Sequence, residues 1–128
     1  MIIHFAHYSK VQQWGWPHFS PKERACRHCG ELLVYEDLLN MLELQRSYSG
    51  KAIIINSAYR CAVWNTLVGG ADLSKHRSGT AVDQSLRGKD RESVYTDAIK
   101  AGFLGIGWYK TFTHTDLGPR REWGARMI

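Results

Sequence analysis

The pattern of apolar and polar positions predicts four helical segments. The clearest covers residues 35–48, where leucines recur at helical spacing and form one apolar stripe before a Ser-Gly stop. A second amphipathic segment covers residues 91–101 and ends at a glycine. Shorter helical segments are predicted at residues 20–23, where Ser, Pro and Glu form a capping pattern, and at residues 61–68, ahead of a Gly-Gly pair.

Strand patterns lie mostly in the second half of the chain. Residues 52–56 form a continuous β-branched run, which is typical of a buried strand. Residues 81–83 begin another strand, and residues 105–109 and 112–117 predict a β-hairpin. The first 20 residues predict a short strand followed by a loop. Helices that precede strands interleaved with one helix predict an α+β fold, with a small, mostly antiparallel sheet and flanking helices.

Length and composition predict a single soluble domain over residues 1–128. The chain is 44% hydrophobic and 23% charged, an ordinary globular balance, and it contains no repeat or linker. The start of the chain has no basic segment followed by a long apolar stretch, so no signal peptide is expected. The longest apolar run, residues 52–55, is far too short to span a membrane, so no membrane insertion is expected.

The charge balance favours an anionic partner. Seventeen Lys and Arg face twelve Asp and Glu, for a formal charge of +5. Nucleic acid, anionic lipid and an acidic cell-wall polymer all fit that charge. A nucleic-acid-binding protein is the less favoured alternative, because the chain has neither a dense basic stripe nor a known nucleic-acid-binding motif.

Two segments supply candidate metal ligands. His76 and Asp83 lie seven positions apart around Gly79, and imidazole nitrogen and carboxylate oxygen are both zinc ligands. On a strand, His114 and Asp116 share one face, so His114 is a candidate third ligand that leaves a fourth position for water. From spacing alone, a loop hydrogen bond and a solvated strand face explain the same residues.

A resemblance to a known family includes these two segments. The stretch SKHRSGTAVD fits the pattern Ser-x-His-x-x-Gly-x-Ala-x-Asp of the zinc D-alanyl-D-alanine peptidases. The chain resembles peptidase family M15, which includes D-Ala-D-Ala carboxypeptidases and L-alanyl-D-glutamate peptidases, and within it the small phage and bacterial branch with a Hedgehog/DD-peptidase fold. The resemblance spans roughly residues 14–123. Four further matching pieces lie at residues 25–32, 55–60, 65–71 and 102–116.

The resemblance implies a role for five residues. His76, Asp83 and His114 would bind Zn²⁺. Arg60 would bind a substrate carboxylate or carbonyl, which suits its fork of donors, and Ser74 would hydrogen-bond the substrate peptide. The zinc would polarise the scissile carbonyl and lower the pKa of its bound water.

One position departs from the family pattern. Many relatives have an acidic general base three residues before the last histidine ligand, but here that residue is Thr111. Asp116 is the nearest acidic substitute and is the predicted catalytic residue, although a carboxylate there also suits a partner that orients a ligand. Asp72 is a weaker candidate for the base.

The sequence leaves the roles of the cysteines and of three tryptophans undecided. The odd number of cysteines argues against a secreted disulfide scaffold. Cys26 and Cys29 have a redox or zinc spacing, with Cys61 and His28 as further ligands, but buried reduced thiols are the favoured interpretation. The tryptophans at positions 14, 16 and 108 suit either a substrate groove or the core.

These observations predict a monomeric zinc peptidase that cuts peptidoglycan stem peptides, at either a D-Ala-D-Ala or an L-Ala-D-Glu bond. It would be made in the cytoplasm without a signal peptide and would act on the cell wall after release, as a phage lysis enzyme (endolysin) does. The alternative is a non-catalytic, zinc-containing wall-binding or virion-associated module of the same fold, which the threonine at position 111 favours.

Overall fold

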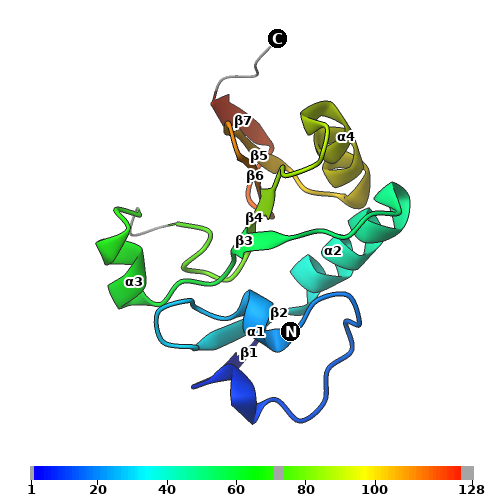
Figure 1. The fold of residues 1–128 in the computed structure, drawn as a ribbon. Coiled ribbons are helices and arrows are strands. Elements are labelled where there is room, and N and C mark those ends of the chain that lie inside the picture. The colour runs from blue at the N-terminus through cyan, green and yellow to red at the C-terminus, as the bar shows by residue number, and fades with distance from the viewer. Residues whose placement is uncertain (1, 71–73, 125–128) are drawn as a thin grey trace.

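The computed structural model describes residues 2–70 and 74–124, and its mixed helices and strands confirm the α+β prediction. The strands form two sheets (Figure 1). A small sheet pairs β1 with β2, and a larger one has the strand order β3-β4-β6-β5-β7. Among the described residues, every strand pair is antiparallel except β5 with β7. The strands are β1 (Ile2–Phe5), β2 (Leu32–Tyr35), β3 (Ile55–Ser57), β4 (Ala81–Ser85), β5 (Gly105–Trp108), β6 (Phe112–Asp116) and β7 (Arg121–Gly124).

The helices begin and end at the signals that the sequence contains. At the first α-helix the side chain of Ser20 accepts a hydrogen bond from the Glu23 amide, and the Glu23 side chain accepts one from the Ser20 amide. None of the helices within the described ranges is long and apolar enough to cross a membrane. The helices are α1 (Pro21–Arg24), α2 (Glu36–Ser49), α3 (Ala62–Leu67) and α4 (Arg91–Ala101), with a 3-10 turn, η1, at Tyr8–Lys10.

The core lies between the large sheet and the pair of helices α2 and α4, which pack side by side (Figure 1). Leu38 and Leu42 of α2, Ala98 of α4, Val82 of β4 and Ile106 of β5 belong to one buried apolar cluster. Figure 1 shows α3 apart from this helix pair. Burial of these apolar side chains is the main force that holds the two helices on the sheet.

The large sheet brings two distant segments into register. β4 lies between β3 and β6, and its register places Asp83 opposite His114. The neighbouring Gln84 faces α2, because its side chain bonds with that of Gln45. Since alternate residues of a strand point to opposite faces, Asp83 faces away from the helix pair.

The strand predictions differ from the structure in three places. The run at residues 52–56 contributes only to the short edge strand β3, and it is not buried on both faces, because Ile53 and Ile55 are buried whereas Ile54 is 55% exposed. Strands β2 and β7 were not predicted. Each is only four residues long, and β2 runs directly into α2.

Candidate metal centre

Three side chains meet on the sheet face opposite α2 and α4. His76 comes from the loop before β4, Asp83 from β4 and His114 from β6. One potential ligand atom from each lies within 4.8 Å of the others. The Nε2 atom of His76 lies 3.1 Å from Asp83 Oδ1, and the Nδ1 atom of His114 lies 3.0 Å from the same oxygen. The structure therefore brings together the three residues proposed as zinc ligands.

The loop before β4 fixes the orientation of His76. The Nδ1 atom of this buried ring lies 2.7 Å from the carbonyl oxygen of Ala58, so Nδ1 carries the hydrogen and Nε2 presents its lone pair to the site. The loop closes through Gly79, whose amide donates to the His76 carbonyl and whose φ is +77°. The positive φ favours glycine there, and a Cβ at Gly79 would also lie 2.9 Å from the end of the Leu33 side chain, which would have to shift.

A second carboxylate orients His114. The Nε2 atom of His114 lies 2.7 Å from Asp116 Oδ2, so Nε2 donates to the carboxylate and Nδ1 faces Asp83. Asp116 is fully buried, and Arg121 donates to both of its oxygens at 2.9 and 2.8 Å. The amide of Gly118 donates to Oδ1 at 2.8 Å. The two histidines thus offer different nitrogens to the site, and both rings have a fixed tautomer.

The electrostatics of the site keep both carboxylates ionised. In the metal-free site burial raises the pKa of Asp83, but the rings of His114 and His76, which donate to Asp83 when they are protonated on both nitrogens, outweigh burial and bring the pKa down to about 2. Burial likewise opposes ionisation of Asp116, and its bonds with His114 and Arg121 hold its pKa well below the ordinary range. Burial lowers the pKa of His114, but Asp116 and Asp83 raise it overall. A paired negative charge at Asp83 suits a bound cation.

The three residues line an open hollow of about 390 Å³. Arg60 Nη2 lies 3.9 Å from Asp83 Oδ2, and Arg60 Nη1 donates to Asn65 Oδ1 at 3.3 Å. Ser74 lines the same hollow, and its hydroxyl accepts a hydrogen bond from the His76 amide at 3.2 Å. Both residues proposed for substrate binding therefore border the convergent ligands.

An aromatic wall closes one side of this hollow. Tyr109 and Phe112 stack with ring centroids 4.4 Å apart, and Trp123 Nε1 donates to the Tyr109 hydroxyl at 2.9 Å. The Trp123 ring also lies 5.0 Å from the ring of His114. Sequence reasoning missed this wall because Trp123 belongs to the unpredicted strand β7. Trp108, by contrast, is buried in the core.

The acidic residues that line this hollow are the candidates to replace the general base that many relatives have at the position of Thr111. Thr111 is exposed at the turn between β5 and β6. Asp83 and Asp116 are the only carboxylates among the described lining residues. Asp72 and Ala71 lie outside the described residues. Because Asp116 is buried and engaged by three partners, its geometry favours the orienting role over the role of a base that exchanges protons with water.

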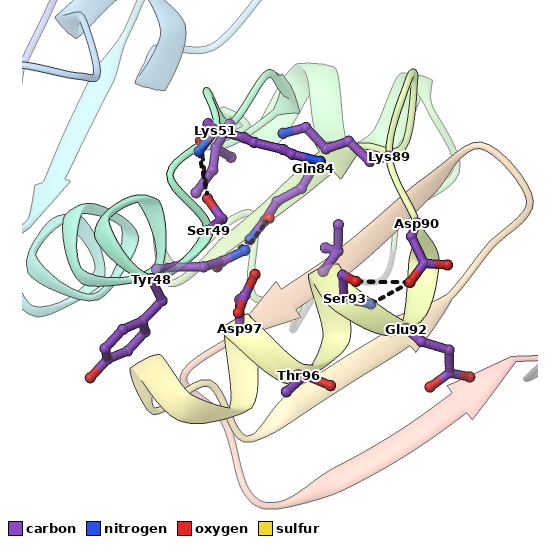
Figure 2. A pocket seen from close by; sticks show the side chains of 13 residues that line it. Tyr48, Ser49, Lys51, Gln84, Lys89, Asp90, Glu92, Ser93, Thr96 and Asp97 are labelled. Atoms are coloured by element: carbon purple, nitrogen blue, oxygen red, sulfur yellow. Dashed lines mark hydrogen bonds between the residues drawn. The ribbon is translucent and has the colours of Figure 1, made fainter.

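A second hollow lies on the other face of β4, between α2 and α4 (Figure 2). Gln84 lines it, and the Gln84 amide group exchanges hydrogen bonds with Gln45 at 2.7 and 2.9 Å. Figure 2 shows its acidic side chains, Asp90 at the N-cap of α4 and Glu92 and Asp97 on the helix, spread apart rather than pointing at one another. Their ligand atoms do not form one of the convergent groups found among the described residues. This hollow is therefore not a second candidate for the metal centre.

Comparison with known proteins gives the family. No curated protein matches the chain with significance. A family model described as Peptidase M15 matches residues 17–117, which is well over half of the 128 residues and includes His76, Asp83 and His114. On this match, the chain belongs to the Peptidase M15 family.

Proposed function

We propose that this chain is a zinc-dependent peptidase that hydrolyses the stem peptides of peptidoglycan. The observation that supports it most is the convergence of His76, Asp83 and His114 at an open hollow, in a chain of the Peptidase M15 family. Three protein ligands with a fourth position open to solvent are the arrangement of a catalytic zinc.

The donor set fits zinc. It consists of two imidazole nitrogens and one carboxylate oxygen, which are borderline ligands that zinc accepts readily. The other nitrogen of each imidazole also has a hydrogen-bond partner. His76 Nδ1 bonds to the Ala58 carbonyl, and His114 Nε2 bonds to Asp116. Such outer partners fix the ring orientation and make the free nitrogen a better ligand.

The residues around the ligands supply substrate binding. A bound zinc would polarise the scissile carbonyl and acidify a bound water. The guanidinium of Arg60, steadied by Asn65, is placed to hold a carboxylate next to the scissile bond. Both candidate bonds have such a carboxylate on the residue that follows the bond, either the terminal carboxylate of D-Ala or the free α-carboxylate of D-Glu. Ser74 would hold the peptide backbone, and the aromatic wall would cover its other side.

Asp116 has a positioning role in this proposal. Its carboxylate holds His114 by the nitrogen that does not face Asp83, and Arg121 holds the carboxylate in turn. Through this chain of contacts, Asp116 sets which nitrogen of His114 is available and keeps it basic.

The experiment is digestion of purified peptidoglycan by the zinc-loaded protein. Newly released amino groups are counted, and the fragments are identified by mass spectrometry. Release of free D-Ala or of a new D-Glu amino terminus supports the proposal and identifies the bond. A protein that is fully loaded with zinc but releases no amino groups would contradict the proposal and support the alternative, a non-catalytic wall-binding module. The features that favour this alternative are the exposed Thr111 and the buried Asp116.

A further inference from the structure

All three cysteines of the chain meet at one place, well separated in the sequence from the ligands of the candidate metal centre. Cys26 and Cys29 lie in the turn after α1, and Cys61 immediately precedes α3. Their three sulfur atoms lie within 4.8 Å of one another. Cys26 and Cys61 are buried, whereas Cys29 is exposed, so the expectation of buried thiols holds for two of the three.

The backbone around the sulfurs is folded tightly. The amide of Gly30 donates to the Cys26 carbonyl at 2.8 Å, and the φ of Gly30 is +80°. This turn brings the side chains of Cys26 and Cys29 to the same side. The Cys61 amide donates to Cys26 Sγ at 3.4 Å, and the Trp64 amide donates to Cys61 Sγ at 3.4 Å. Such N–H···S contacts stabilise a thiolate more than a neutral thiol.

We propose that Cys26, Cys29 and Cys61 form a second zinc site, held by three thiolates and structural in role. Thiolates are preferred zinc ligands, and structural zinc sites are held by four protein ligands, with three cysteines and one histidine among the common sets. A disulfide uses only two sulfurs and would leave the third beside it, whereas one cation engages all three. The fourth ligand would come from the exposed His28, one residue before Cys29, whose ring stacks on Trp64 with ring centroids 5.6 Å apart and would leave that stack on binding.

The surroundings explain what such a site would stabilise. Cys26, Cys61 and Tyr59 form a small buried cluster that is separate from the main core. A cluster of that size buries little apolar surface, and small lobes commonly rely on a metal or a disulfide for stability. The segment that ends at Cys61 also contains Arg60 and the Ala58 carbonyl that orients His76. A zinc at the cysteines would therefore hold the segment that supports the candidate metal centre.

Cobalt substitution distinguishes the two sites because only one of them contains sulfur. The protein is stripped of metal, reconstituted with Co²⁺ and examined for the near-ultraviolet thiolate-to-cobalt charge-transfer band. We expect the band in the wild type and in His114→Ala, and we expect its loss in Cys29→Ser and in Cys61→Ser. Zinc content is expected at about two equivalents in the wild type and about one in His114→Ala and in Cys29→Ser.

The result that would overturn this proposal is a wild-type protein without the charge-transfer band, whether its thiols are free or joined in a disulfide. A wild type with about one equivalent of zinc, all of it lost in His114→Ala, would overturn it equally. Neither readout depends on peptidase activity. If the proposed function fails, peptidoglycan stays uncut while the cobalt–thiolate band remains, so the two failures are distinguishable.

Discussion

The two groups of convergent ligands found within residues 2–70 and 74–124 are held in different ways. His114 and Asp83 lie on paired strands, and sheet register sets the distance between them. The three cysteines lie in a turn and at the start of a short helix, in a lobe with little apolar core. A metal at the first site therefore meets ligands that are already in place, and its loss should remove activity more than stability. A metal at the second site should contribute mainly to stability.

The largest effect is expected from Asp83→Ala. This change removes the carboxylate that lies beside both histidines, so zinc at this site and peptidase activity should be lost together. Activity should fall by roughly 1,000-fold or more, because the metal-activated water is lost with the zinc. Zinc analysis and amino-group release are measured on the same preparation.

Asp37→Ala is the matched control, because Asp37 is exposed on α2 and should keep full zinc and activity. Asp83→Ala should also keep the cobalt–thiolate band of the cysteine site. Loss of that band together with activity would mean that the two sites are not independent.

A smaller effect is expected from Asp116→Asn. The substitution keeps the shape of the side chain but weakens its hold on His114, so zinc affinity and activity should each fall about 10- to 100-fold. Added zinc should restore part of kcat, because the role of Asp116 is to position a ligand. A variant with unchanged zinc affinity, low kcat at every zinc concentration and an altered acidic limb of the pH profile would show that Asp116 is a general base.

Gly105→Ala tests the contact between Asp116 and Arg121 without changing a metal ligand. A Cβ at Gly105 would lie 2.0 Å from Asp116 Oδ1 and 2.4 Å from Arg121 Nη1, so the ion pair must shift. We expect destabilisation by about 1–3 kcal/mol, typical of overpacking, together with weaker zinc binding. Denaturant unfolding and zinc titration measure the two effects. Gly15→Ala is the control, since nothing lies within 4 Å of its added Cβ, and equal behaviour of the two variants would contradict this account of the contact.

The smallest effect concerns pH in the metal-free protein. A carboxyl whose pKa is lower in the folded than in the unfolded protein stabilises the fold at a pH above its unfolded pKa. This stabilisation is lost as the pH falls through the folded pKa. For Asp83, that loss should run from about pH 4 down to about pH 2. The pKa of His114 is raised in the folded protein, so its effect on stability has the opposite pH dependence. The stabilisation from His114 is full below about pH 6.5 and is lost as the pH rises through the folded pKa.

Unfolding free energies measured across this pH range in the presence of a chelator should decline at both ends. Asp83→Asn should weaken both declines, because Asp83 bonds to His114 and to His76. Cys29→Ser should leave both declines in place, because that residue belongs to the other group of ligands. Identical pH profiles for Asp83→Asn and the wild type would contradict the electrostatic account of the site.

The residues that could be predicted from sequence are those whose signals are local. Helix α4 has the predicted bounds, because Asp90 caps it and Gly102 ends it within a short stretch. The convergence of His76, Asp83 and His114 was predicted from a ten-residue motif and strand alternation. Arg121 and Trp123 were missed because they belong to β7, which pairs with β5 across a non-local, parallel contact that no short sequence pattern marks.

The convergence of the three cysteines is a second feature that local sequence signals do not reveal. The spacing of Cys26 and Cys29 is visible in the sequence, but Cys61 lies 35 positions beyond Cys26, and only the tertiary fold brings its sulfur to theirs. Likewise, the choice between an orienting role and a base role for Asp116 depends on its burial and on Arg121, and neither of these can be read from the residues around it.

The central claim is that a catalytic zinc binds at His76, Asp83 and His114, and anomalous diffraction at the zinc absorption edge tests it most directly. Crystals of protein shown to cut peptidoglycan should give an anomalous peak bonded to Nε2 of His76, to the Asp83 carboxylate and to Nδ1 of His114. An active protein with no anomalous peak among these three residues would contradict the claim.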